Sequence, residues 1–279
     1  MDWFDSVILG IVEGLTEFLP VSSSGHMILT NKLLGYEDAP DILKTFEVVI
    51  QLGAILAIAL VYWKKILQVF GLNKKETVKG LSVDQFPKKR LTLVHVAIAI
   101  VPALGLAFLL RHPIKDLGFS QYPVLLSLIV GGIYMWVSEA LYDKGKIKRT
   151  SETMDDITYK QALIIGLLQC LSLWPGFSRS GSTIAAGMLS GLSYRAAADF
   201  SFFIAIPIMV VASGYEILDN LGNFHSSDIG FFVTGFLVSF VVAWIVIVTF
   251  LKVLQKVKLK YFAWYRFALA ILFYFLVMM

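Results

Sequence analysis

The hydrophobic positions of the chain form long apolar runs, and the charged residues cluster in the segments between them. Runs long enough to cross a bilayer as a helix lie near residues 45–63, 92–111, 122–141, 197–218, 229–250 and 261–278. Two further apolar segments, 5–34 and about 160–191, are interrupted by proline, glycine and serine. Because helices satisfy their own backbone hydrogen bonds in lipid, this pattern predicts an all-α polytopic membrane protein.

The first interrupted segment predicts two half-length helices. Asp5–Leu19 would form a helix of roughly 22 Å, short of a hydrocarbon core of about 30 Å. The polar turn Pro20–Gly25 follows, and a second short apolar piece runs from His26 to Leu34. Two short helices joined by such a turn are typical of a re-entrant hairpin, whose irregular backbone must be surrounded by protein or by a wet cavity.

The second interrupted segment contains PGFSRSGST, Pro175–Thr183. An arginine at bilayer depth, here Arg179, marks a functional site by default because its burial is costly. Arg179 could bind an oxyanion through two hydrogen bonds, and a helix that restarts near Ser182 would offer free N–H groups to the same anion. The neighbouring hydroxyl groups that could donate to it are Ser178, Ser180 and Thr183. The alternative interpretation is a surface turn with an arginine that snorkels to water.

The two interrupted segments align without a gap at an offset of 156 residues, so that Ser22–Gly25 meets Ser178–Gly181. We therefore predict one membrane domain over residues 1–279, built from a first repeat, 1–145, and a second, 146–279. Each repeat holds a re-entrant hairpin and three spans, and an odd number of crossings inverts the second repeat. Inverted repeats with paired broken helices predict a site near the midplane, where the two breaks meet.

Composition and charge support a membrane location. Hydrophobic residues make up 57% of the 279 residues and charged residues 16%. Most of the 24 lysine and arginine residues fall in the predicted loops 64–91, 142–160 and 251–260, all on one side. The positive-inside rule places these loops in the cytoplasm and both termini outside the cell. The net charge of +4 therefore gives no reason to expect nucleic acid as a partner. The single cysteine, Cys170, excludes an intramolecular disulfide.

The first hairpin carries acidic, basic and hydroxyl side chains. Glu13 and Glu17 are spaced i, i+4 and share one helix face. Buried together, they would repel unless a divalent cation such as Mg²⁺ or Ca²⁺ separates them, or one of them could act as a general base. Alternatively, both face water at a helix end. His26 is a candidate acid, base or nucleophile, or a purely structural histidine. The candidate nucleophiles or phosphate ligands are Ser22, Ser23 and Ser24.

Facing each other, the two breaks would form a pocket with acid, base or metal on one side and an anion clamp on the other. Such a pocket suits phosphoryl transfer, in which catalysis rests on positioning and on neutralisation of charge. The competing hypothesis is a transporter, because inverted repeats and broken helices are transporter features. A flippase of polyprenyl phosphate lipids would need the clamp but not the nucleophile.

EGLTEFLPVSSSGH (Glu13–His26) and PGFSRSGST (Pro175–Thr183) resemble the two signatures of the undecaprenyl-diphosphate phosphatase family, the bacitracin-resistance proteins of the UppP/BacA type. FEVVIQLGAILA (Phe46–Ala57) resembles a third segment, and the resemblance covers nearly the whole chain. It implies hydrolysis of undecaprenyl diphosphate to undecaprenyl phosphate and inorganic phosphate in the bacterial cytoplasmic membrane. This reaction recycles the lipid carrier of peptidoglycan synthesis, and it implies bacitracin resistance.

The resemblance also implies roles for individual residues. The catalytic positions are Glu17, Ser23, His26 and Arg179. The diphosphate-binding positions are Ser22, Ser24, Ser178, Arg179, Ser180 and Thr183. Glu13 and Glu17 would hold a divalent cation, Mg²⁺ or Ca²⁺. The expected partners are undecaprenyl diphosphate and membrane lipids, and the choice between monomer and homodimer stays open. Attack by Ser23 and attack by water activated by His26 both remain as mechanisms.

Overall fold

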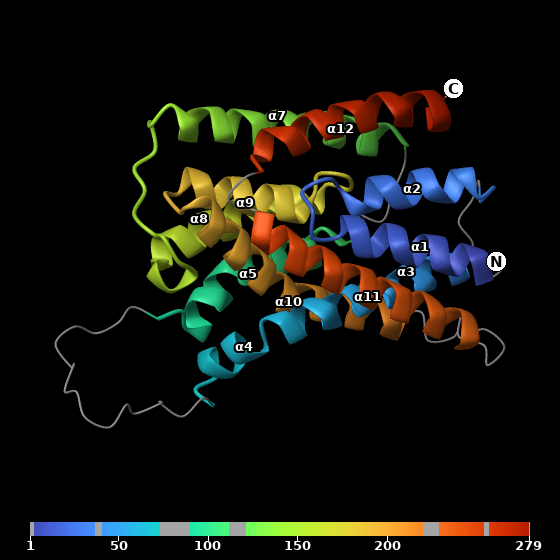
Figure 1. Cartoon of the computed structure of the whole chain (residues 1–279), viewed down its shortest axis with the longest axis horizontal. Helices are drawn as coiled ribbons and strands as arrows, with labels where there is room; N and C mark the ends of the chain where they lie inside the picture. The colour runs from blue at the N-terminus through green and yellow to red at the C-terminus, as the bar shows by residue number, and fades with distance from the viewer. Residues whose placement is uncertain are drawn as a thin grey trace.

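The computed structural model describes residues 3–36, 41–72, 90–111, 121–219, 229–253 and 257–278. Over these residues the chain is all-helical (Figure 1). The helices before residue 145 are α1 (Trp3–Thr16), α2 (Ser23–Leu33), α3 (Asp41–Val61), α4 (Trp63–Val69), α5 (Leu93–Leu109) and α7 (Gln121–Asp143). Those after it are α8 (Tyr159–Gln169), α9 (Arg179–Leu189), α10 (Tyr194–Asp219), α11 (Ile229–Val253) and α12 (Leu259–Phe273), with a π-helical end at Tyr274–Met278. Short 3₁₀ turns lie at Met154–Asp156 and Cys170–Leu173.

The predicted all-helical, multi-pass character is confirmed by the apolar helices. Five described stretches are long and apolar enough to cross a membrane: Ile42–Val61, Gln121–Asp143, Tyr194–Asp219, Ile229–Val253 and Leu259–Val277. The span predicted near 92–111 is the shorter apolar helix α5, of 17 residues. Many large apolar side chains lie exposed on these helices, as Val233, Leu237 and Ile245 do on α11. Lipid, rather than water, is the surrounding that such a surface favours.

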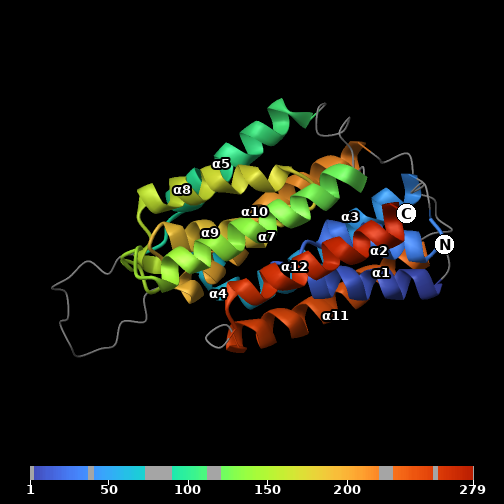
Figure 2. The same cartoon turned by 90° about the horizontal axis from the view of Figure 1, so that it is seen from above.

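Glycines allow close helix packing between the first and second parts of the chain. α1 packs against α11, and α8 packs against α5 (Figure 2). A Cβ atom at Gly10 would lie 2.8 Å from the carbonyl oxygen of Gly235. A Cβ atom at Gly166 would lie 2.6 Å from the carbonyl oxygen of Ala99. Small residues at such crossings let the backbones of membrane helices approach each other closely.

The helices that follow the two breaks match each other in length and in capping. α2 and α9 each have 11 residues, and their bounds are offset by 156. Their N-caps, Ser22 and Ser178, have φ of 74° and 73°, the only positive values at described residues other than glycine. Ser22 Oγ accepts a hydrogen bond from Gly25 N, and Ser178 Oγ accepts one from Gly181 N, each over 3.2 Å.

Serine capping also corrects two predicted boundaries. α2 begins at Ser23 rather than at His26, and α9 begins at Arg179 rather than near Ser182. The capping hydroxyl satisfies a first-turn N–H group that would otherwise have no partner, so the helix can start directly after the serine. As a result, Ser23 and Arg179 are the first residues of their helices, at the edge of the breaks.

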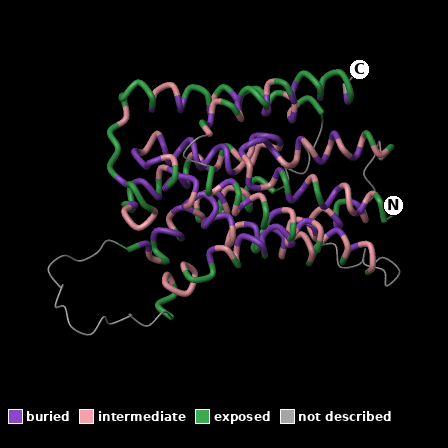
Figure 3. The backbone as a smooth tube through the Cα atoms, in the orientation of Figure 1, coloured by how far each residue is buried: buried purple, intermediate pink, exposed green. Residues whose placement is uncertain are grey.

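The breaks lie in the interior of the bundle. In Figure 1, α2 and α9 run roughly end to end, and the two interrupted loops face each other between them. Buried residues gather in this middle region, whereas much of α7 and α12 is exposed (Figure 3). Nine of the eleven residues of α9 are buried. The chain thus places its most irregular backbone inside the fold, as irregular backbone at membrane depth requires.

Candidate functional site

Glu17 connects the first break to the second. Its backbone N–H still donates to the carbonyl of Glu13 over 3.0 Å, so Glu17 continues the turn of α1 and stays on the Glu13 face. Glu17 Oε2 accepts a 2.6 Å hydrogen bond from Ser23 Oγ, and Oε1 forms a 3.1 Å ion pair with Arg179 Nη2. The paired side chains are only 8% and 14% exposed. A charge pair this well buried interacts more strongly than a pair in water, because the surrounding dielectric is low.

Arg179 and Ser180 bring the start of α9 against the first break. The guanidinium of Arg179 lies 5.7 Å from the centre of the Phe18 ring and donates to the carbonyl of Ser201 over 3.3 Å. Ser180 Oγ donates to the carbonyl of Leu19 over 3.0 Å. Residues more than 150 positions apart in the sequence therefore share one cluster, which is where the repeat argument predicts that the breaks meet.

The helix N-termini add to the positive character of this cluster. α2 and α9 both begin at the breaks, and their N-terminal ends face the region between them (Figure 1). A helix N-terminus carries a partial positive charge and free N–H groups, so it favours a bound anion. With Arg179 as the first residue of α9, the cluster has the charge and the donors to bind a phosphate or diphosphate group.

Glu13 has the properties expected of a cation ligand. It is 4% exposed and lies one helical turn before Glu17, on the same face. Among the described residues its Oε1 atom has no hydrogen-bond donor. Mg²⁺ commonly binds to one or two carboxylates and completes its shell with water and substrate phosphate. No group of three His, Cys, Asp or Glu side chains suited to a metal occurs in the described ranges. The Glu13–Glu17 pair with its unpartnered oxygen therefore fits a cation shared with the substrate.

His26 is turned away from the Glu17 carboxylate. Its Nδ1 lies 2.7 Å from the carbonyl oxygen of Ser22, and its Nε2 lies 2.8 Å from the hydroxyl oxygen of Tyr265. A carbonyl oxygen only accepts, so Nδ1 carries the proton and, in the neutral ring, Nε2 accepts from Tyr265. The structure thus places His26 next to the cluster through the backbone of Ser22, with its ring engaged by α12.

The remaining predicted hydroxyl groups are divided between the loops and the helix interior. Ser22 and Ser178 cap their helices, and Ser24 lies in the first turn of α2. Thr183 is fully buried, donates to the carbonyl of Arg179 over 2.9 Å and lies 2.5 Å from Ser201 Oγ. The structure therefore brings Glu13, Glu17, Ser23 and Arg179 together directly, whereas Thr183 supports the backbone of Arg179 from behind.

Sequence reasoning missed two neighbouring residues of α12, Tyr265 and Arg266. Arg266 is fully buried and donates to carbonyl oxygens in the second break and in α7. The rule that singles out Arg179 applies to it equally, because Arg266 interrupts the predicted apolar span 261–278. The charge inside an apolar span is the signal that points to Arg266, although no motif surrounds it.

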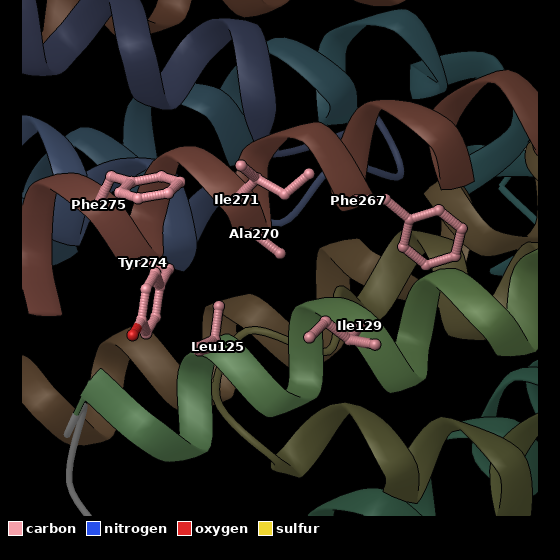
Figure 4. Close-up of a pocket in the computed structure, with 7 residues that line it drawn as sticks. All are labelled: Leu125, Ile129, Phe267, Ala270, Ile271, Tyr274 and Phe275. Carbon is pink, nitrogen blue, oxygen red and sulfur yellow. The ribbon is translucent and has the colours of Figure 1, made fainter.

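Two apolar pockets flank α7 and contain none of the clustered residues. One, of about 800 Å³, lies between α5, α7 and the turn that ends at Trp174 and Pro175. The other, of about 380 Å³, lies between α7 and α12. In Figure 4, Leu125 and Ile129 of α7 face side chains of α12 and of its π-helical end, Tyr274 among them, across this second pocket. Their lining suits hydrocarbon chains and not a phosphate group.

Comparison with known proteins places this arrangement in a family. The family described as bacitracin resistance protein BacA matches residues 6–272, which include both breaks and all of α12 but its last residue. The chain belongs to the BacA family.

BacA-family relatives match over almost their full length. The chain is 46% identical over 272 residues to a protein named undecaprenyl-diphosphatase 1 of Bacillus anthracis, covering 98% of this chain and 97% of the relative. It is equally similar, over the same shares, to the protein of that name from Bacillus thuringiensis subsp. konkukian (strain 97-27). It is 47% identical over 266 residues to that of Bacillus thuringiensis (strain Al Hakam), covering 95% of each chain.

Proposed function

We propose that this BacA-family chain hydrolyses undecaprenyl diphosphate to undecaprenyl phosphate and inorganic phosphate. In doing so it would recycle the lipid carrier of peptidoglycan synthesis and confer bacitracin resistance. The observation that carries the proposal is the Glu17 carboxylate, bound on one side by the Ser23 hydroxyl and on the other by Arg179. Relatives named undecaprenyl-diphosphatase support the same substrate. The polyprenyl tail would remain in the lipid while the diphosphate reaches the cluster.

Substrate binding follows from the charges at the two breaks. The diphosphate would take over Arg179 from Glu17 and accept hydrogen bonds from the N–H groups at the starts of α2 and α9. Ser24 in the first turn of α2, Ser178 at the N-cap of α9 and Ser180 in its first turn are close enough in sequence to these helix starts to add hydroxyl donors. This arrangement neutralises the phosphate charge in a region that largely excludes water, where such interactions are strongest.

The Ser23–Glu17 hydrogen bond suggests the chemical step. Ser23 already donates its hydroxyl proton toward Glu17 Oε2 over 2.6 Å, so Glu17 can accept this proton as general base. Ser23 Oγ would form a bond to the terminal phosphorus, and the bond from that phosphorus to the bridging oxygen would break. Undecaprenyl phosphate leaves. Water would then bond to the phosphorus held on the serine, the bond from that phosphorus to Ser23 Oγ would break, and Glu17 would return its proton to Ser23 Oγ. Inorganic phosphate leaves with the hydroxyl of the water, whose other proton passes to solvent. His26, whose ring donates to the Ser22 carbonyl, would hold the start of α2 in place.

Glu13 and Glu17 would hold a divalent cation, Mg²⁺ or Ca²⁺. When bound, the cation supplies positive charge that offsets the developing charge of the diphosphate. The role of Glu13 in this proposal rests on its unpartnered and buried Oε1 atom.

We further infer that the chain is an inverted repeat in the bacterial cytoplasmic membrane, in which each half, residues 1–145 and 146–279, holds a re-entrant hairpin and three transmembrane helices. The matched bounds and caps of α2 and α9 support this. The helix packing supports it too, because α1 of the first half packs against α11 of the second, and α8 of the second half packs against α5 of the first. The basic loops would face the cytoplasm and both termini the outside.

A membrane-impermeant maleimide would test this orientation. It would be applied to variants without Cys170 that carry a single cysteine at Lys148 or at Trp3. Labelling of Lys148→Cys in intact cells would contradict the orientation.

The test of function is phosphate release from undecaprenyl diphosphate by the purified protein in the presence of Mg²⁺. We expect release by the wild type and a loss of at least about 100-fold in Glu17→Gln and Arg179→Ala, because each removes a group acting on the reacting phosphate. Glu152→Gln and Arg195→Ala, at exposed positions, are the matched controls and should retain activity. A folded wild type that releases no phosphate but moves polyprenyl phosphate between vesicle leaflets would instead favour a transporter.

A further inference from the structure

Both breaks contain backbone carbonyl groups that accept hydrogen bonds from side chains, and those of the second break accept from no backbone N–H group of the described residues. Inside a membrane such a group needs a donor from elsewhere in the protein, because no bulk water is available and an unpaired polar group is costly. In the first break the Ser22 carbonyl accepts a long helical bond from His26 N, over 3.3 Å, and a shorter one from the His26 ring, over 2.7 Å. In the second break the carbonyls are those of Gly176 and Phe177. Two adjacent residues of α12 supply these contacts: Arg266 donates directly to the second break, and Tyr265 holds the His26 ring that donates to the first.

Arg266 supplies the donors for the second break. Its Nη1 donates to the Phe177 carbonyl over 2.6 Å, and its Nη2 donates to the Gly176 carbonyl over 2.9 Å. Its Nε and Nη2 also donate to the carbonyls of Leu128 and Ser127 on α7, over 3.2 and 2.9 Å. A planar guanidinium with five N–H groups can hold several acceptors in one fixed arrangement, which an ammonium cannot do. Arg266 thus joins the second break to α7.

The surroundings of Arg266 are shaped for this contact. A Cβ atom at Gly131 of α7 would collide with the guanidinium, so the glycine leaves the space that the arginine fills. Ser127 Oγ donates to the Pro175 carbonyl over 2.5 Å and adds a second tie between α7 and the same break. The next residues of the chain are Ser178 and Arg179. Any movement of the Gly176–Phe177 backbone would therefore move the Arg179 guanidinium.

Tyr265 acts on the first break through His26. Its hydroxyl donates to His26 Nε2 over 2.8 Å, and the two rings are nearly parallel, with an interplanar angle of 7°. This bond keeps the ring proton on Nδ1, which is the nitrogen that donates to the Ser22 carbonyl. The residue after Ser22 is Ser23, whose hydroxyl donates to Glu17. Since Tyr265 is 48% exposed, its hydroxyl can be removed without opening a cavity in the core.

We propose that Tyr265 and Arg266 are positioning residues, which hold Ser23 and Arg179 at the distances needed for phosphate release. This assignment rests on the proposed phosphatase function. Neither residue touches the reacting phosphate in this scheme. Arg266 acts through the Gly176–Phe177 backbone, and Tyr265 acts through His26 and the Ser22 carbonyl. A displacement of about 1 Å in a reacting group can lower a rate about 100-fold, so removing either tie should be visible in kcat.

The test compares the wild type with Tyr265→Phe, Arg266→Lys and the control Tyr261→Phe, one turn away on α12 and 56% exposed. We expect Tyr265→Phe to lower kcat about 10-fold and Arg266→Lys about 100-fold, with KM changed much less than kcat. Tyr261→Phe should match the wild type. If Arg266→Lys does not fold, Gly131→Ala displaces the guanidinium by a different route and should give the same loss.

A double-mutant cycle separates positioning from general stability. In a His26→Gln background, Tyr265→Phe should cause no further loss, because its effect passes through the imidazole. An equal loss in both backgrounds, or a Tyr265→Phe enzyme as active as Tyr261→Phe, would overturn the assignment while leaving the phosphatase function intact. A wild type that releases no phosphate at all would instead reject the proposed function, and this assignment with it.

Discussion

Replacing Arg179 by methionine should destabilise the protein more than any exposed charge substitution. The change removes the ion-pair partner of Glu17 and leaves the Glu17 carboxylate buried beside Glu13 without that counter-charge. Breaking a buried ion pair by removing one partner costs about 3–5 kcal/mol. The Glu17 and Arg179 side chains are 8% and 14% exposed, so solvent screening reduces this figure little. For a chain of this size the cost corresponds to a fall in Tm of roughly 6–20 °C.

The double variant Glu17→Met/Arg179→Met makes the prediction specific. Replacing both members of a buried pair by apolar side chains of similar size is often close to neutral, so the double variant should regain most of the stability, to within about 1 kcal/mol of the wild type. Phosphate release should stay absent in both variants. The double variant should therefore be stable but inactive, because stability depends on the balance of charge whereas phosphate release needs the carboxylate and the guanidinium themselves.

Thermal unfolding in detergent micelles without added divalent cation, followed by circular dichroism, would measure these differences. Arg195→Met is the matched control, because Arg195 is 61% exposed and lies 3.8 Å from Asp199. Exposed pairs of this kind contribute about 0–1 kcal/mol, so its Tm should change by a few degrees at most. An Arg179→Met variant as stable as this control, or a double variant no more stable than Arg179→Met alone, would refute the reasoning.

Three further outcomes are expected. Ser23→Ala should lower kcat for phosphate release by about 100-fold or more, whereas Ser24→Ala, which leaves the Glu17 contact intact, should lose less than about 10-fold. Gly166→Ala should lower the free energy of unfolding by about 1–3 kcal/mol, because its Cβ would lie 2.6 Å from a carbonyl oxygen, whereas Gly105→Ala meets open space and should be neutral in thermal unfolding. Chelation of divalent cations should abolish phosphate release, and Glu13→Gln should raise the Mg²⁺ concentration needed for half-maximal rate; a rate unchanged by chelation would contradict the cation assignment.

The helical fold could be predicted largely from hydrophobic runs, because membrane helices must be long and apolar. The boundaries at the breaks could not. Apolar periodicity suggested helix starts at His26 and near Ser182, whereas the structure starts them three residues earlier, after Ser22 and Ser178. Capping is a local backbone geometry with φ near 74°, which hydrophobicity does not encode.

The repeat predicts that the two breaks face each other, and the structure brings Glu17 of the first break against Arg179 of the second. The surroundings of His26 did not follow, because they depend on how α12 packs against both breaks. Its partner Tyr265 is more than 200 residues away in the sequence, and a tyrosine in an apolar helix resembles an interface anchor. For Arg266, the rule that a charge inside an apolar span is costly points to the residue itself. Its partners could not be predicted, because they are backbone carbonyls that no sequence pattern marks.

The Glu17–Arg179 ion pair makes ligand binding an exchange. Arg179 is already matched with a carboxylate that the chain itself supplies, at the high effective concentration of a tethered group. A singly charged anion offers little more than this carboxylate and should compete poorly. A diphosphate brings more charge and more acceptor atoms, so it can displace Glu17. In the proposed reaction the displaced carboxylate would keep its contact with Ser23 and, without the charge of Arg179 beside it, would take a proton more readily, so ligand entry would also prepare the base.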